Sequence, residues 1–232
     1  MLPSFPLLAI DTSSRAGYVA LWKDRHQCVA HKIHEVDSHN EKLAEVVDRA
    51  CSELSLSAKQ IRSVFFGGGP GSFTGLRIGA SFVIGLLIGA DSLPSDTPVL
   101  YVSQSLEVFA RGLLHAIPAL PDVLIAADAR RDEVYAFALS ADGQIVVPLG
   151  IYPAHPRPGA CTVPSGGEPH DPANFSADQF LHGVLATLEA QPSSVKPYGI
   201  NELAQLELHY LREVAAKTIA ERSSGKAPGS VS

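Results

Sequence analysis

The sequence predicts an α/β protein made of two domains. Three short apolar runs rich in β-branched and aromatic residues open the chain, and a segment with helical periodicity follows them. Strands followed by a helix begin again near residue 122, so we place a domain boundary near residue 104. The predicted units are residues 1–104, residues 105–222 and a frayed tail, 223–232. A chain of 232 residues with 46% hydrophobic residues is long enough for two small packed domains.

The first half combines strands with two long helices. Ser38 and Glu41 form a capping box, in which each side chain accepts a hydrogen bond from a backbone amide at the start of a helix. The helix over 73–90 is apolar nearly all round, which predicts burial on more than one side. The predicted elements are strands at 6–10, 17–21, 27–33, 61–66 and 99–102, and helices at 38–54, 73–90 and 103–115.

The second half is expected to contain an antiparallel sheet and further helices. Strands at 122–127 and 133–139 are followed by the turn Asp142-Gly143, which leads into a strand at 145–147. Residues 151–174 are rich in proline and glycine and should be irregular. Ser176 and Gln179 form a second capping box that opens a helix ending at Leu188, and Asn201 is the candidate cap of a last helix.

Composition excludes several functional classes. A net charge of −6 argues against independent nucleic-acid binding, which normally requires a basic surface. Cys28, Cys51 and Cys161 are widely spaced and form no CxxC pair, which favours a reducing compartment and argues against thiolate zinc. The N-terminus lacks a positively charged leader, and the apolar stretch 76–90 is too short to span a bilayer. We therefore expect a soluble, cytoplasmic protein.

The glycine-rich segment from Gly67 to Gly75 is a candidate anion site. It leads into the N-terminus of a helix, where the backbone amides around Gly71 and Ser72 and the helix dipole favour negative charge. The segment contains neither a P-loop GK[ST] nor the dinucleotide-binding spacing of glycines. The alternative is a tight strand-to-helix turn without a ligand.

Two aspartates end the first strand of each half. Asp11, followed by Thr12, and Asp128 could bracket a bound nucleotide, or each could simply cap the turn after its strand. Helical metal ligands are spaced i, i+3 or i+4, but His26, His31 and His34 fall on predicted strand or loop. In a strand, His31 and His34 would point to opposite faces, so we expect no metal site.

Five segments resemble the TsaB family, also called YeaZ, of bacterial tRNA threonylcarbamoyladenosine biosynthesis subunits. They are LLAIDTSS, SHNEKL, GGGPGSFTGLRIG, ADARRDEVYAF and YLR, and the similarity is dense over residues 7–139. The resemblance implies an actin-like/hexokinase-like (ASKHA) fold of two RNase H-like domains. It also implies a TsaD-like catalytic partner and a TsaE-like ATPase, which together modify adenosine 37 of tRNA.

Within that resemblance, the residues favour a scaffold over an enzyme. The catalytic paralogue binds metal through a helical HxxxH, but this chain has His39 with Leu43 at the second position. Kinases of this fold carry a glycine-rich phosphate hairpin where this chain has Arg130 and Arg131. We therefore predict a non-catalytic subunit that activates TsaD, has no cofactor and meets tRNA only through the complex. The alternative is an active ASKHA kinase or ATP-dependent transferase that uses Asp11 and Asp128.

The resemblance implies that helices 38–54 and 73–90 pair with the same two helices of a partner in a four-helix bundle. The partner is expected to be TsaD in a heterodimer, or a second copy when the chain is alone. The candidate interface residues are Leu43, Val46, Val47 and Ala50 on the first helix, and Arg77, Ala80 and Ile84 on the second. The alternative is that these residues pack on the domain's own sheet. Gly75 and Gly79, then Gly85 and Gly89, sit four apart and form a smooth strip that another backbone could approach.

Overall fold

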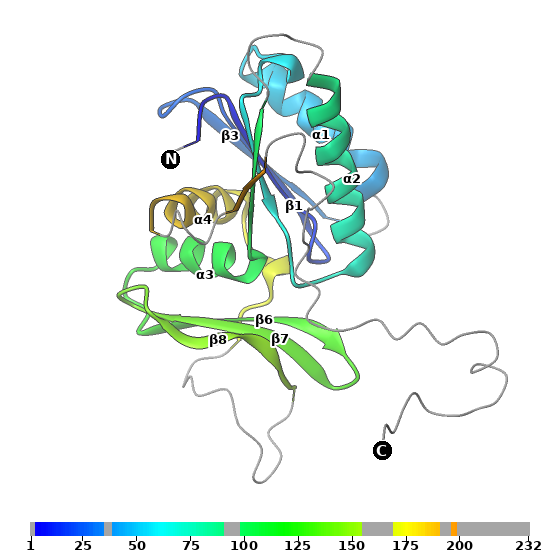
Figure 1. The fold of residues 1–232 in the computed structure, drawn as a ribbon. Helices are drawn as coiled ribbons and strands as arrows, with labels where there is room; N and C mark the ends of the chain where they lie inside the picture. The colour runs from blue at the N-terminus through cyan, green and yellow to red at the C-terminus, as the bar shows by residue number, and fades with distance from the viewer. Residues whose placement is uncertain (1–2, 35–38, 91–97, 155–168, 191–195, 199–232) are drawn as a thin grey trace, which may run out of the picture.

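The computed structural model describes residues 3–34, 39–90, 98–154, 169–190 and 196–198. Two sheets are stacked with a pair of helices between them, and a second pair of helices covers the far face of the larger sheet (Figure 1). The predicted α/β architecture is therefore present. Within the described residues, no helix combines the length and the apolar character needed to cross a bilayer.

The larger sheet has six strands in the order β3-β2-β1-β4-β5-β9. The first three strands form an antiparallel meander, and β4 and β5 run parallel to β1. These strands are β1 (Leu7–Asp11), β2 (Gly17–Trp22), β3 (Cys28–Ile33), β4 (Ser63–Gly67), β5 (Val99–Ser103) and β9 (Lys196–Tyr198). All but β9 were predicted to within about two residues, the usual uncertainty of element ends. The short edge strand β9 adds to β5 from a distant part of the chain, where no local pattern indicates it.

Helices cover both faces of this sheet. On one face lie α1 (His39–Glu53) and α2 (Phe73–Ala90), and on the other lie α3 (Ser105–Ala116) and α4 (Ala177–Ala190). Two short 3₁₀ helices, Ala58–Gln60 and Pro172–Asn174, join these layers. Because both faces are covered, β1 and β2 are buried at every residue.

The smaller sheet is an antiparallel set of three strands in the order β6-β7-β8. Its strands are β6 (Asp122–Arg130), β7 (Glu133–Ser140) and β8 (Ile145–Pro153). It packs on α3 from the side opposite the larger sheet, so Phe65 and Phe137 share one core cluster with Phe109 between the sheets. The predicted boundary near residue 104 falls between β5 and α3, although α3 packs against both sheets.

Two glycines set the close approach of α3 and α4. A Cβ at Gly112 would lie 2.1 Å from the Gln179 carbonyl oxygen, and one at Gly183 would lie 2.1 Å from the Val108 carbonyl oxygen. Both distances are far below van der Waals contact, so these positions require glycine. The smaller sheet is thereby held close to the larger one.

The two predicted capping boxes have different outcomes. At the start of α4, the Ser176 amide donates to Gln179 Oε1 at 2.8 Å, and the Gln179 amide donates to Ser176 Oγ at 3.1 Å, which confirms that box. The other box involves Ser38, which lies outside the described residues, as do Cys161, the helix expected after Asn201 and the tail. In the stretch expected to be irregular, β8 continues to Pro153.

Candidate functional site

Three loops meet where the parallel strands β1, β4 and β5 end. In the register of the sheet, Asp11 pairs with Gly67, and Gly67 pairs with Ser103, so these residues form one row at the carboxyl edge. This edge is where α/β proteins commonly place their functional groups. The Gly68 amide donates to the Ser103 carbonyl at 2.8 Å, which holds the second loop against the third.

Asp11 is fully buried at the centre of this edge. Its Oδ1 accepts hydrogen bonds from the Ser13 amide at 2.8 Å and the Ser13 hydroxyl at 2.7 Å. Its Oδ2 has no hydrogen-bond partner among the described residues, and it lies 1.8 Å from where a Cβ at Gly67 would be. Burial raises the pKa of Asp11 to about 6, against the opposing effect of the nearby Ser105 and Ser13 hydroxyls. The carboxyl is thus enclosed by protein, and Gly67 leaves the space it occupies.

The glycine-rich loop uses its backbone amides internally. The Gly69 amide donates to Ser105 Oγ at 3.0 Å, and the Ser72 amide donates to the Ser13 carbonyl at 2.6 Å. A Cβ at Gly71 would lie 2.1 Å from that same Ser13 carbonyl oxygen. Thr12 is also engaged, since its hydroxyl donates to the Gly75 carbonyl at 2.7 Å. These contacts favour the tight strand-to-helix turn over the anion site.

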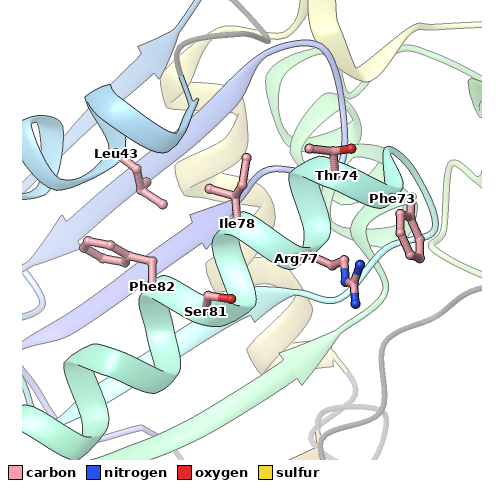
Figure 2. A pocket seen from close by; sticks show the side chains of 7 residues that line it. All are labelled: Leu43, Phe73, Thr74, Arg77, Ile78, Ser81 and Phe82. Carbon is pink, nitrogen blue, oxygen red and sulfur yellow. The ribbon is translucent and has the colours of Figure 1, made fainter.

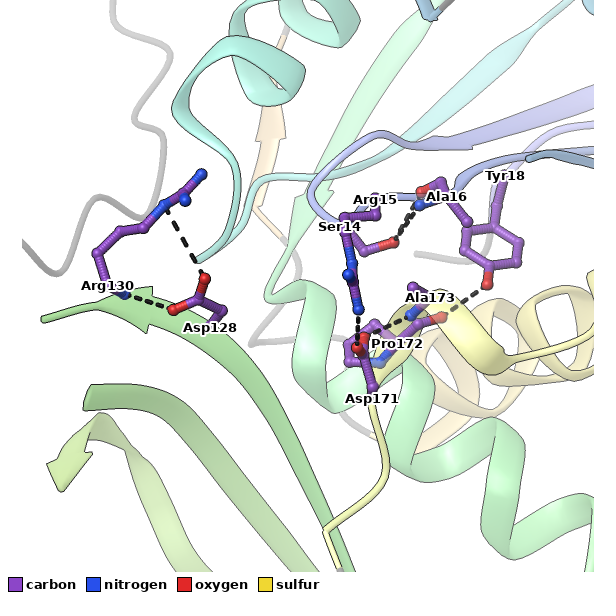
Figure 3. Close-up of polar contacts among 9 residues, drawn as sticks. All are labelled: Ser14, Arg15, Ala16, Tyr18, Asp128, Arg130, Asp171, Pro172 and Ala173. Atoms are coloured by element: carbon purple, nitrogen blue, oxygen red, sulfur yellow. Dashed lines mark hydrogen bonds and ion pairs between the residues drawn. The ribbon is translucent and has the colours of Figure 1, made fainter. Parts of the chain in front are cut away.

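Asp128 is placed quite differently from Asp11. Its side chain is 71% exposed at the end of β6, where Oδ1 accepts the Arg130 amide at 2.7 Å (Figure 3). The hairpin that follows is strained, because Arg130, Arg131 and Asp132 all have positive φ angles, of 68°, 57° and 61°. The hydrogen bond from the Arg130 amide is what we expect if Asp128 caps the turn after its strand. Asp11 is therefore enclosed in the core, whereas Asp128 caps a surface hairpin.

A strap around Asp171 ties the second half of the chain to the larger sheet, which sequence reasoning missed. Arg15 forms an ion pair with Asp171 at 3.0 Å, and the Tyr18 hydroxyl donates to the Pro172 carbonyl at 2.6 Å (Figure 3). Lys32 Nζ donates to the Phe175 carbonyl at 2.8 Å. These segments lie far apart in the sequence and meet in the folded chain, so no local pattern could indicate the strap.

The structure corrects most of the expected interface residues. Leu43, Val46, Val47, Ala50 and Ala80 are at most 7% exposed and belong to the core between the larger sheet and helices α1 and α2. The physical reason is that α1 has one apolar stripe, and the chain's own sheet takes it. Ile84 is half-buried and Arg77 is exposed, so these two remain available at the surface.

The outer face of α2 carries an apolar surface of its own. Phe73 is 43% exposed and Ile88 is 59% exposed. Ser81 and Gly85 between them, and Gly89 directly after Ile88, are also exposed, and a Cβ built at either glycine meets no atom within 4 Å. We call Phe73, Ser81, Gly85, Ile88 and Gly89 the outer face of α2.

The other glycine pair of α2 has the opposite role. A Cβ at Gly75 would lie 2.0 Å from the Thr12 carbonyl oxygen, and one at Gly79 would lie 2.3 Å from Thr12 Oγ1. The strip that the sequence indicated is therefore divided. Its first half packs on the chain's own loop, and its second half is open to solvent.

A groove of about 500 Å³ lies beside the outer face, between α1 and the first half of α2. Leu43 projects from α1 toward Ile78 and Phe82 of α2, and the Arg77 guanidinium lies 4.8 Å from the Phe73 ring centroid (Figure 2). The groove is lined by Leu43, Phe73, Thr74, Arg77, Ile78, Ser81 and Phe82. Sequence reasoning missed Phe73, Ser81, Phe82 and Ile88. The available signal was that a helix apolar on all sides keeps an apolar surface after one side is buried.

The chain is similar to proteins of tRNA threonylcarbamoyladenosine synthesis. A family model described as "TsaD: tRNA N6-adenosine threonylcarbamoyltransferase" matches residues 33–147. The chain is 34% identical over 134 residues to the tRNA threonylcarbamoyladenosine biosynthesis protein TsaB of Haemophilus influenzae, covering 58% of this chain and 53% of that protein. It is 37% identical over 129 residues to TsaB of Escherichia coli K12, covering 56% and 52%.

The chain is thus similar to TsaB proteins over rather more than half of its length. It spans about half the length of the curated TsaB relatives it matches. The solved structure of YeaZ from Pseudomonas aeruginosa superposes with a TM-score of 0.65 at 20% identity, covering 85% of this chain and 96% of that one. The ASKHA fold that the resemblance implied is thereby confirmed.

Leu43, at the second position of the expected HxxxH, is 1% exposed and packs in the core. Among the residues that the structure describes, no group of three or more His, Cys, Asp or Glu side chains is arranged to hold a metal ion. Leu43 therefore has a packing role.

Proposed function

We propose that this chain is a non-catalytic scaffold subunit for the synthesis of threonylcarbamoyladenosine in tRNA, acting in the cytoplasm. In this proposal it dimerises with a TsaD-like catalytic protein and activates it, with a TsaE-like ATPase joining the complex. Similarity to TsaB proteins and the match to the TsaD family model support the reaction assigned. The tRNA is bound through the complex, in keeping with the net charge of −6.

The observation that carries the proposal is the apolar outer face of α2. Phe73 and Ile88 stand exposed on either side of Gly85, where a neighbouring backbone meets no side chain. Burying exposed apolar surface contributes roughly 25 cal/mol per Å², so a partner helix laid along this face gains free energy from both large side chains. The glycine allows that helix to approach closely, as small residues do at tight helix–helix contacts.

The groove beside this face adds selectivity. Arg77 is held over the Phe73 ring, so a positive charge stands at the edge of an otherwise apolar surface. A partner helix with a carboxylate at the matching position would pair with it, while a basic partner would be repelled. The same face also accounts for the proposed homodimer of the isolated chain.

The two aspartates support a scaffold rather than an enzyme. Asp11 is enclosed by Gly67 and the loops around it, and Asp128 is engaged with its own hairpin. A kinase of this fold needs both carboxylates free to act on a nucleotide in one cleft. Tight binding of Mg-ATP by the lone chain, measured by calorimetry, would contradict this part of the proposal.

The test compares one substitution at two surfaces. Ile88→Glu places a charge on the outer face of α2, and Ile145→Glu places the same charge on β8, where the residue is 51% exposed. After co-expression with a TsaD-like protein, we expect the Ile88 variant to fold but to lose both co-purification and modified tRNA. The Ile145 variant should retain both. Equal binding by the two variants would overturn the proposed docking face.

A further inference from the structure

Asp11 sits at the junction that positions the N-terminal end of α2. Its Oδ1 fixes Ser13 through two hydrogen bonds, and the Ser13 carbonyl in turn accepts the Ser72 amide at 2.6 Å, directly before α2 begins. The neighbouring Thr12 hydroxyl donates to the Gly75 carbonyl in the first turn of the helix. One carboxyl group therefore anchors the turn to which α2 is attached.

The same carboxyl is poorly suited to carrying charge in this position. It is fully buried, and Oδ2 has no hydrogen-bond partner among the described residues. A buried carboxylate without a counter-charge is strongly disfavoured relative to the neutral carboxyl. Ionisation is relieved when water reaches Oδ2, and that requires Gly67 and Ser105 to move away from the carboxyl.

The groups that face Asp11 do not provide a compensating charge. On β2, its register partner is Tyr18, whose pKa is raised further above its usual range by burial, so this side chain stays neutral. From β4 and α3, the groups against it are Gly67 and Ser105. On α3, Arg111 pairs with Glu107 at 2.8 Å. Of these groups, Asp11 is the one whose pKa, at about 6, lies between pH 5 and pH 8.

We propose that Asp11 is a protonation-dependent latch on the N-terminal end of α2. The neutral carboxyl keeps the loops after β1, β4 and β5 together, and the ionised carboxylate loosens them. Because α2 carries the outer face, the latch also tunes docking, and this last consequence rests on the proposed function.

The test measures amide hydrogen exchange of the full chain without a partner, at about pH 5 and about pH 8, with rates divided by the intrinsic chemical rates. If the enclosed carboxyl titrates near pH 6 and the opened one near 3.8, the opening equilibrium of residues 68–76 should rise about tenfold between these conditions. Asp11→Asn keeps a neutral side chain at every pH and should remove this rise. Asp128→Asn, which changes an exposed carboxylate, should behave like the wild type.

Several results would overturn the latch. These are protection of residues 68–76 that is independent of pH, a pH effect that persists in Asp11→Asn, or a parallel change in the amides of α3 and α4, which would indicate global unfolding. Should Asp11→Asn fail to fold, Ser105→Ala takes its place. Because the Ser105 hydroxyl lowers the pKa of Asp11, its removal should shift the midpoint of the opening to higher pH, and an unchanged midpoint counts against the latch. Since no partner is present, a negative result here leaves docking to TsaD untouched, and a failure of docking leaves this result unchanged.

Discussion

Replacing Gly85 with alanine should stabilise the free chain while weakening its docking. Glycine in a helix interior costs about 1 kcal/mol relative to alanine, because it loses more backbone entropy on folding. At Gly85 the added methyl meets no atom within 4 Å, so nothing in the chain offsets that gain. We expect the free energy of unfolding to rise by about 0.5–1 kcal/mol.

Gly79, six residues earlier on the same helix, is the matched control. Its added methyl would lie 2.3 Å from Thr12 Oγ1 and 2.7 Å from Phe66 Cε2. Overpacking of this kind costs about 1–3 kcal/mol. The helix-propensity gain is the same for both substitutions, so it cancels in their difference. Gly79→Ala should therefore be about 1–3 kcal/mol less stable than Gly85→Ala.

Urea unfolding followed by circular dichroism measures both stabilities, and titration with a TsaD-like protein measures docking. If a partner helix packs against Gly85, an overpacking cost of about 1–3 kcal/mol weakens binding by about 5- to 150-fold in Gly85→Ala. The reasoning is refuted if Gly85→Ala destabilises the chain or if both variants shift stability equally. Unchanged docking by a stabilised Gly85→Ala would mean that the partner helix does not approach α2 at this glycine.

Three further substitutions test other parts of the structure. Asp11→Asn should raise stability at neutral pH by up to about 3 kcal/mol, since the pKa of the folded carboxyl is about 6 and its usual value is 3.8. Because the pKa of Asp11 is raised in the folded state, this carboxyl stabilises the wild type fully below about pH 4, and the contribution is lost as the pH rises through 6. The urea midpoint should therefore fall across this range in the wild type and much less in Asp11→Asn. Gly183→Ala should lower the melting temperature, because its methyl would lie 2.1 Å from the Val108 carbonyl oxygen at the crossing of α3 and α4. Leu43→Ala should cost about 2–5 kcal/mol of stability in urea unfolding, as expected for a residue that is 1% exposed.

Most secondary structure was predictable because it depends on local sequence patterns. The β-rich runs of β1 to β3 and the capping box at Ser176 depend on neighbouring residues, and the structure has them as expected. Strand β9 and the strap at Asp171 depend on pairing with segments far away in the chain. No period or capping residue indicates such contacts, so they could not be predicted.

The candidate site shows where a periodic pattern stops being informative. The stripe of Leu43, Val46 and Val47 correctly indicates an apolar helix face, but the pattern is the same whether a sheet or a partner covers it. On α2, spacing alone gives Gly79 and Gly85 the same significance. Only the surrounding atoms distinguish the glycine packed against Thr12 from the one that faces open space.

Asp11 links the N-terminal end of α2 to the outer face of the same helix. Docking on the outer face is tighter when α2 is already held in position, because less conformational freedom is lost on binding. The N-terminal end is held by Ser13 and Thr12, and Ser13 is in turn held by a carboxyl that costs stability once it ionises. An asparagine at that position would avoid the charge. A carboxyl in its place makes the position of α2 depend on protonation, so the structural cost and the proposed latch have the same physical origin.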